Sequence, residues 1–201
     1  DLKLDSATIA TGLLHDTIED TQATYKTIEK EFGKEVADLV DGVTKISAYE
    51  NQAASDSKAE NFRILIIATS KDIRVLLVKV ADRLHNMRTI QFVSKKEKQI
   101  RKAKETMEIY APLADRMGMN RIRDELEDLS FQVLNPNARK LIKDRLDQIK
   151  VNNLNNFNTI SEDFSNLLKE NKLIAKIYGR EKTPFSICLL YTSPSPRDDI
   201  S

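Results

Sequence analysis

Residues 15–20 have the sequence His-Asp-Thr-Ile-Glu-Asp, which brings one imidazole and three carboxylates into a short stretch. Side chains three or four positions apart share a helix face, so we expect His15 beside Glu19 and Asp16 beside Asp20. Imidazole nitrogen and carboxylate oxygen together suit Mn, Fe or Zn, and such an ion lowers the pKa of bound water and neutralises phosphoryl oxygens. Glu19 and Asp20 would then orient the attacking water, act as acid or base, or position a ligand. The alternative is an acidic, solvated helix face, since short motifs give many false matches.

A second polar motif, Ala-Asp-Arg-Leu-His-Asn at residues 81–86, interrupts the most apolar helical stretch of the chain. Buried polar groups are costly unless they are paired or bind a ligand, so Asp82 is the candidate third metal ligand. Asp82 and Asn86 are four residues apart and therefore face the same way. The alternative is a buried pair between Asp82 and an arginine that serves packing alone. His85 is expected to be structural or to support a ligand, which leaves His15 as the expected histidine ligand.

Helices must hold both motifs in place, and the apolar periodicity predicts an all-α body. Asp41-Gly42 predicts a helix break, residues 47–57 predict a polar loop, and Pro112 predicts a helix end. Asparagines between residues 152 and 158 predict a turn, and only Ile174–Tyr178 has strand character. The expected helices cover residues 7–16, 24–32, 35–40, 60–69, 72–87, 96–110, 121–134, 140–149 and 160–169.

The charge balance of the chain argues against some partners. Its 201 residues include 32 basic and 31 acidic side chains. This balance gives no excess positive charge of the kind that binds nucleic acid or a membrane surface. The apolar runs are too short to span a bilayer, and no signal peptide opens the sequence. The single cysteine excludes an intramolecular disulfide and a cysteine-based zinc site. We therefore expect a reducing, cytoplasmic setting.

Both ends of the sequence indicate a fragment. It begins at Asp1, without an initiator Met, inside an apolar-periodic segment. From Cys188 to Ser201 the sequence resembles the translated read-through of a sequencing-library adapter. We therefore expect residues 188–201 to be a non-native tail, and a genuine Pro/Ser-rich linker is the alternative.

Several ordered motifs resemble the hydrolase half of the RelA/SpoT homologues, the enzymes of the alarmone (p)ppGpp. The resemblance extends from Asp1 to about Ile187 and is far more specific than the first motif alone. It implies an HD-type helical bundle over residues 1–134, linker helices over 135–172 and the first strand of an α/β synthetase domain within 173–187. The motifs are Gly12-Leu-Leu-His-Asp-Thr-Ile-Glu-Asp20, Asp41-Gly-Val-Thr-Lys45, Val78-Lys-Val-Ala-Asp-Arg-Leu-His-Asn-Met-Arg-Thr89, Glu108-Ile-Tyr-Ala-Pro-Leu-Ala-Asp-Arg-Met-Gly118, Glu125-Leu-Glu-Asp-Leu-Ser-Phe131 and Leu134-Asn-Pro136.

The resemblance also implies a role for each candidate residue. His15, Asp16 and Asp82 would hold the metal, usually Mn²⁺, and Glu19 with Asp20 would be the catalytic acidic pair. The reaction would be hydrolysis of the 3′-pyrophosphate of ppGpp or pppGpp, which gives GDP or GTP and pyrophosphate. The nucleotide-binding positions implied by the family are Asn86 and Thr89 for the guanosine nucleotide, and Arg180 and Lys182 for the donor ATP of the partial synthetase domain.

One family feature is missing from the sequence, because the family takes a further histidine ligand and basic nucleotide-binding residues from an upstream helix. The chain as given is therefore expected to be nearly inactive, since such groups act as a unit. Its intact His-Asp and Glu-Asp pairs resemble hydrolase-competent members rather than synthetase-only ones. Two alternatives stay open, namely an HD phosphohydrolase acting on another nucleotide and a non-catalytic regulatory module. Contacts with the ribosome or other regulators are implied only for the full-length parent.

Overall fold

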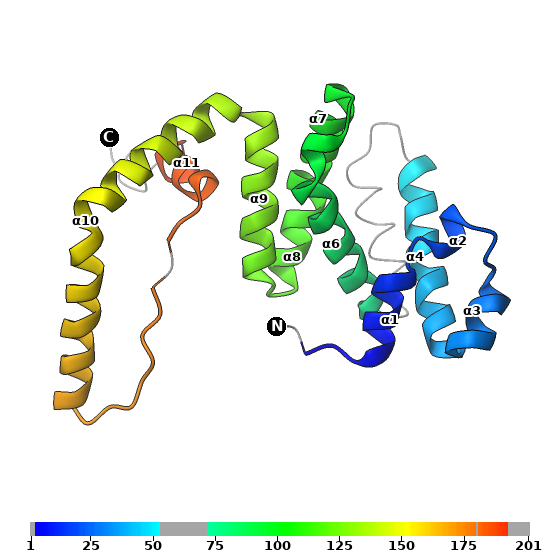
Figure 1. Cartoon of the computed structure of the whole chain (residues 1–201), viewed down its shortest axis with the longest axis horizontal. Coiled ribbons are helices and arrows are strands. Elements are labelled where there is room, and N and C mark those ends of the chain that lie inside the picture. The colour runs from blue at the N-terminus through cyan, green and yellow to red at the C-terminus, as the bar shows by residue number, and fades with distance from the viewer. Residues whose placement is uncertain (1–2, 53–71, 180, 193–201) are drawn as a thin grey trace, which may run out of the picture. The chain divides into compact units, whose positions relative to one another are not determined.

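The computed structural model describes residues 3–52, 72–179 and 181–192. Within these ranges all regular structure is helical and no strand forms, which confirms the predicted all-α fold. The chain divides into two compact units, residues 1–130 and 131–201, which are described separately (Figure 1). The helix expected at residues 60–69 and the second part of the loop expected at 47–57 lie outside the described residues.

The first unit is organised around two of its longer helices, α4 (Lys34–Gln52) and α6 (Ile73–Arg88). The short helices that precede α4 in the chain all pack against it, and the first of them also packs against α6. No helix among the described residues is long and apolar enough to cross a membrane. The other elements are α1 (Ser6–Leu14), α2 (Thr17–Asp20), α3 (Tyr25–Phe32), η1 (Ile90–Phe92), α7 (Lys96–Glu105), η2 (Thr106–Tyr110), α8 (Ala111–Arg116) and α9 (Asn120–Leu134), whose last turn belongs to the second unit.

The packing of α4 against α6 forms the centre of the first unit. Val40 and Val43 of α4 are completely buried. The two helices approach closely at Gly42, where a Cβ atom would lie 2.9 Å from Cγ2 of Val75. The helix break predicted at Asp41-Gly42 is therefore wrong. Glycine at this position permits close contact between helices, and α4 continues through it.

α1 and α3 pack against the first half of α4 through an apolar cluster centred on Ile28 and Val40. Thr24 begins α3 as its N-cap, because its side chain accepts a hydrogen bond from the backbone nitrogen of Thr27. Tyr25 Oη donates a hydrogen bond of 2.7 Å to Asp38 Oδ1, and this bond raises the pKa of Tyr25 to about 12. Leu14 packs against the same cluster, so the C-terminal end of α1, which precedes the first polar motif, is held against α4.

The first turn of α6 is joined to α1 and α4 by the side chain of Arg74. Asp72 caps α6 by accepting a hydrogen bond of 2.9 Å from the backbone nitrogen of Arg74, and Asp72 Oδ2 lies 2.7 Å from Nη2 of the same residue. Nη1 of Arg74 lies 3.2 Å from Asp5 Oδ2 and 2.7 Å from Glu35 Oε1. Hydrogen bonds from Arg74 lower the pKa of Asp72, and hydrogen bonds from Thr8 lower the pKa of Asp5.

The helix end predicted at Pro112 is wrong, because the chain stays helical from α7 through η2 into α8. The turn η2 is a π-helix, in which the backbone nitrogen of Ala111 donates to the carbonyl oxygen of Thr106. Proline lacks an N–H group and crowds the carbonyl four residues before it. A wider π turn before Pro112 removes this conflict without ending the helix.

The second unit contains α10 (Pro136–Glu170) and α11 (Pro184–Thr192), which pack against each other. Rings of Phe131 and Phe185 lie 5.6 Å apart between centroids and are tilted. The turn predicted by the asparagines is wrong, because α10 is continuous through residues 152–158. Asparagine is only a moderately poor helix former, and neither Pro nor Gly occurs at residues 137–170.

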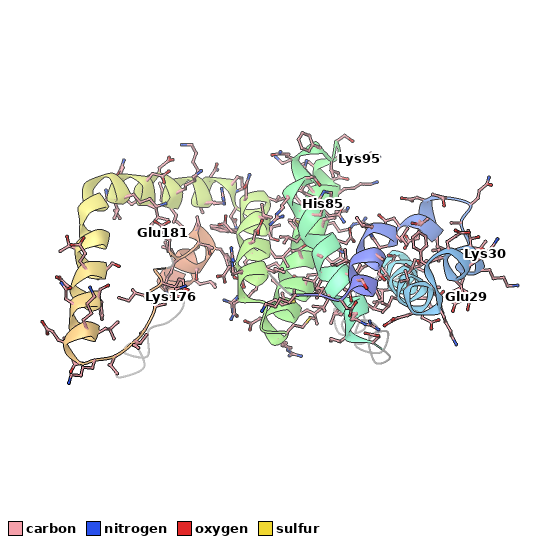
Figure 2. The ribbon with its side chains drawn as sticks, turned by 60° about the horizontal axis from the view of Figure 1, so that its bottom comes forward. Glu29, Lys30, His85, Lys95, Lys176 and Glu181 are labelled. Atoms are coloured by element: carbon pink, nitrogen blue, oxygen red, sulfur yellow. The ribbon has the colours of Figure 1, made fainter. Side chains whose placement is uncertain are left out.

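The strand predicted at Ile174–Tyr178 does not form, and residues 173–179 have neither helix nor strand structure. A strand needs a neighbour that satisfies its backbone groups, and the described residues contain none. Tyr178 is 80% exposed, which agrees with an unpaired segment. Lys176 and Glu181, labelled in Figure 2, lie in this connection between α10 and α11. Residues 188–192 of the expected tail continue α11, and residues 193–201 lie outside the described part.

Replacing Gly42 by alanine should destabilise the first unit, although alanine is the better helix former. The added methyl group meets Val75, whose β-branched side chain has one preferred rotamer in a helix, so we expect a loss of about 1–3 kcal/mol. The matched control is Gly12→Ala in α1, where a Cβ meets no atom within 4 Å and stability should rise by up to about 1 kcal/mol. Urea denaturation measures both changes, and equal effects in the two variants would contradict the close contact.

Acid should weaken the ion pairs of Arg74. Asp5 and Asp72 have lower pKa values in the folded chain than in the unfolded one. They therefore stabilise the fold above their unfolded pKa, and this contribution is lost as the pH falls through their folded pKa. Between about pH 5 and pH 3, the free energy of unfolding should fall more steeply for the wild type than for Arg74→Met. Parallel pH curves from urea denaturation would show that Arg74 has no such role.

Candidate metal and phosphohydrolase site

The first polar motif lies at a break between α1 and α2. The single helix expected through residue 16 is wrong, because α1 ends at Leu14 and Asp16 has φ −93° and ψ −2°. This bridge conformation ends the helix and is common among active-site residues. The carbonyl oxygen of Asp16 accepts hydrogen bonds from the backbone nitrogens of Glu19 at 3.1 Å and Asp20 at 2.9 Å. The two acidic residues therefore belong to the separate short helix α2, where both are exposed.

The imidazole of His15 lies between two carboxylates. Its Nδ1 is 2.8 Å from the carbonyl oxygen of Gly12, and an acceptor there requires the proton to be on Nδ1. Nε2 lies 3.0 Å from Asp16 Oδ2 and 3.5 Å from Asp82 Oδ1, and it is buried without a hydrogen-bond partner. In the tautomer with its only proton on Nδ1, the nitrogen lone pair meets two carboxylate oxygens, and such a group of acceptors is stabilised by a cation.

Asp82 is held on α6 by its neighbours. Its side chain is only 16% exposed, and its Oδ1 accepts a hydrogen bond of 2.8 Å from Nδ2 of Asn86. The alternative for this motif was a packing pair between Asp82 and an arginine. The neighbouring Arg83 does not form that pair. Arg83 Nη1 lies 3.0 Å from Glu105 Oε2, and its guanidinium lies 4.1 Å from the centre of the Tyr110 ring. Asp82 is therefore directed to the histidine rather than to Arg83.

The donors present fit a divalent transition-metal ion by chemical type, since His15 offers nitrogen and the two aspartates offer oxygen. Among residues 3–52, 72–179 and 181–192, however, no three His, Cys, Asp or Glu side chains already have the geometry of a metal site. Asp16 and Asp82 approach the imidazole itself instead of surrounding a common point. The Asp16 side chain is 54% exposed and so has room to rotate toward an ion. The orphaned Nε2 of His15 is the observation that supports the fit.

The other residues predicted for the site are divided between the end of α6 and the second unit. Asn86 is partly buried beside Asp82, and Thr89 Oγ1 donates a hydrogen bond of 3.0 Å to the carbonyl oxygen of His85 at the end of α6. The side chain of His85, labelled in Figure 2, is exposed. Lys182 is exposed in the second unit. Arg180, the other predicted ATP-binding residue, lies outside the described residues.

Sequence reasoning missed two residues beside Asp82. Lys79 is 6% exposed, and its Nζ donates a hydrogen bond of 2.8 Å to Ser47 Oγ and lies 3.6 Å from Asp82 Oδ2. The polar loop predicted from residue 47 is wrong at its start, because Ser47 is buried within α4. A signal was present, because Lys79 falls between two valines in an apolar stretch and a buried lysine requires partners.

Comparison with known proteins identifies the class of fold. The family model described as HD domain matches residues 1–120, a range that contains His15, Asp16 and Asp82. The chain therefore belongs to the HD domain family.

Individual relatives narrow the similarity further. The guanosine-3′,5′-bis(diphosphate) 3′-pyrophosphohydrolase of Haemophilus influenzae is 42% identical over 186 residues, which are 92% of this chain and 27% of that protein. The bifunctional (p)ppGpp synthase/hydrolase SpoT of Escherichia coli is 43% identical over 187 residues, 93% of this chain and 26% of that protein. The GTP pyrophosphokinase rsh of Brucella ovis is 48% identical over 187 residues, 93% of this chain and 25% of that protein. These matches confirm the resemblance to RelA/SpoT homologues, and the chain spans about a quarter of the length of these relatives.

If His15, Asp16 and Asp82 bind a metal ion, Mn²⁺ should raise the melting temperature of the chain, because a ligand that binds only the folded state stabilises it. The increase should disappear in Asp82→Asn. The matched control is Asp41→Asn, which removes a carboxylate from α4 that pairs with Lys45 and should leave the increase unchanged. Circular dichroism melting with and without Mn²⁺ measures the shift, and an equal shift in all three proteins would contradict the ligand set.

Proposed function

We propose that this chain is the hydrolase region of a bifunctional alarmone synthetase/hydrolase and that it acts on guanosine 3′,5′-bis(diphosphate). The reaction is hydrolysis at the 3′ position, which releases pyrophosphate and leaves GDP, or GTP when the substrate is pppGpp. The names of the Haemophilus influenzae and Escherichia coli relatives support this substrate. The structural observation that carries the proposal is the buried Nε2 of His15, which has carboxylates of Asp16 and Asp82 at 3.0 Å and 3.5 Å.

In the proposed site His15, Asp16 and Asp82 hold Mn²⁺. When bound, such an ion acidifies water and neutralises charge on phosphoryl oxygens. The carbonyl oxygen of Gly12 keeps the proton on Nδ1 of His15, so Nε2 presents its lone pair to the ion. Asn86 keeps Oδ1 of Asp82 beside the histidine. These contacts orient the ligands before substrate arrives, which is the usual contribution of a protein to a metal site.

Glu19 and Asp20 are proposed as the catalytic acidic pair. Both are exposed on α2, directly after the turn that contains His15 and Asp16. A carboxylate there can accept a proton from the attacking water, and a carboxylic acid can donate one to the leaving pyrophosphate. Asn86 and Thr89, at the C-terminal end of α6, are proposed to contact the guanosine nucleotide. Arg180 and Lys182 are proposed to belong to the ATP site of a synthetase domain.

A cytoplasmic location and a small nucleotide as partner complete the proposal. Contacts with the ribosome or other regulators belong to the proposed full-length parent. A non-catalytic regulatory module is the second candidate function. It is disfavoured because such a module has no chemical need for the acidic pair Glu19 and Asp20 beside His15 and Asp16.

Single-turnover hydrolysis tests the proposal, with protein in excess over ppGpp so that a slow reaction is also detected. Mn²⁺-dependent release of pyrophosphate is the expected result. Glu19→Gln and Asp20→Asn should each lower the rate by about 10²-fold or more and leave Mn²⁺ binding unchanged. The matched control Glu31→Gln alters an exposed acid on α3 and should keep the wild-type rate.

Two outcomes would contradict this function. A rate that is equal in the wild type and in Glu19→Gln would remove the acidic pair from the mechanism. Release of pyrophosphate at the same rate with and without Mn²⁺ would remove the proposed metal site from the mechanism.

A further inference from the structure

Lys79 is a buried cation beside the proposed metal ligand Asp82. It lies on the interior side of α6, where only 6% of the residue is exposed. Withdrawing an ammonium group from water is costly unless it gains hydrogen bonds and an opposite charge. The structure supplies both, because Nζ donates to Ser47 Oγ at 2.8 Å and lies 3.6 Å from Asp82 Oδ2. Lys79 therefore connects the proposed ligand Asp82 to helix α4.

Ser47 is arranged to receive this hydrogen bond. Its Oγ lies 3.4 Å from the carbonyl oxygen of Val43, one turn earlier in α4, and donates its proton there. The lone pairs of the hydroxyl are then free to accept from Lys79. The contacts form a chain from the backbone of α4 through Ser47 and Lys79 to Asp82. Each link is buried or partly buried, so solvent screens it little.

The carboxylate of Asp82 is thereby held at both oxygens. Nδ2 of Asn86 donates to Oδ1 at 2.8 Å, and the ammonium of Lys79 lies beside Oδ2. With Oδ2 attracted toward α4, Oδ1 faces Nε2 of His15 at 3.5 Å. Rotation about the side chain of Asp82 would break one of these interactions. The orientation of the carboxylate is therefore determined by groups that are not themselves metal ligands.

We propose that Lys79, supported by Ser47, is a positioning residue that holds Asp82 in the orientation required to bind the metal ion. This inference rests on the proposed function, because it requires Asp82 to be a ligand. It adds a residue whose side chain touches neither metal nor substrate. Removing a residue that contacts a metal ligand, but not the metal itself, commonly lowers metal affinity by about 10–100-fold.

Arg83 provides the comparison that separates positioning from packing. It is also a buried cation of α6, 8% exposed, and it also pairs with an acid of another helix. Its contacts include Glu105 and the ring of Tyr110. Loss of either cation should lower stability, but only loss of Lys79 should release the carboxylate of Asp82.

The test measures Mn²⁺ affinity by electron paramagnetic resonance on the purified chain, at a temperature where circular dichroism shows each variant to be folded. Lys79→Met should weaken Mn²⁺ binding by about 10–100-fold, and Arg83→Met should leave it near the wild-type value. Ser47→Ala keeps the lysine but removes its anchor, so it should weaken binding by a smaller factor. The double variant Ser47→Ala/Lys79→Met should bind no more weakly than Lys79→Met, because both changes act through one chain of contacts.

Wild-type affinity in Lys79→Met, or an equal loss in Lys79→Met and Arg83→Met, would overturn the inference. If Lys79→Met does not fold, Ser47→Ala decides the question, and unchanged affinity in that variant would likewise overturn it. Asp82→Asn distinguishes this failure from failure of the metal site. Mn²⁺ binding that is lost in Asp82→Asn but intact in Lys79→Met contradicts only the role of Lys79, whereas binding that survives in Asp82→Asn contradicts both proposals.

Discussion

The close packing of α4 against α6 is the constraint on which the rest of the first unit depends. Gly42 permits the approach, since any larger residue would meet Val75. α1 packs against both helices, so the position of its C-terminal end follows from theirs. That end continues into His15, and α6 carries Asp82. His15 and Asp82 are far apart in sequence. They meet because the apolar packing of α4 against α6 determines how α1 and α6 are placed relative to each other.

Much of the fold could be predicted from the sequence, because apolar periodicity reports directly on which helix faces are buried. Three of the errors share one cause, because in each a local breaking signal does not end its helix. Gly42 permits a close helix contact, and the helix before Pro112 widens into a π turn. The asparagines of α10 lie in a stretch without glycine or proline, so the helix continues through them. The apolar segment 174–178 has strand composition, but pairing depends on a partner that its own residues cannot supply.

The candidate site was predictable to a different extent. Residue types and spacing indicated metal and acid chemistry at His15 and Asp16 and offered Asp82 as a third ligand, and the resemblance to a family implied the same three residues. The separations of 3.0 Å and 3.5 Å around Nε2 could not be obtained from a pattern, because they depend on how α1 and α6 pack. The burial of Lys79 runs against the usual assignment of a lysine to solvent. A lysine flanked by valines was nevertheless a usable sign.

The contact between Nδ1 of His15 and the carbonyl oxygen of Gly12 has a consequence for how such a site can diverge. The acceptor belongs to the main chain, so every amino acid at position 12 supplies the same oxygen. Genetic drift at that codon can alter the stability of α1, yet it leaves the tautomer of the histidine intact. The hydrogen bond that favours a proton on Nδ1 therefore depends on the path of the backbone and not on the side chain at position 12.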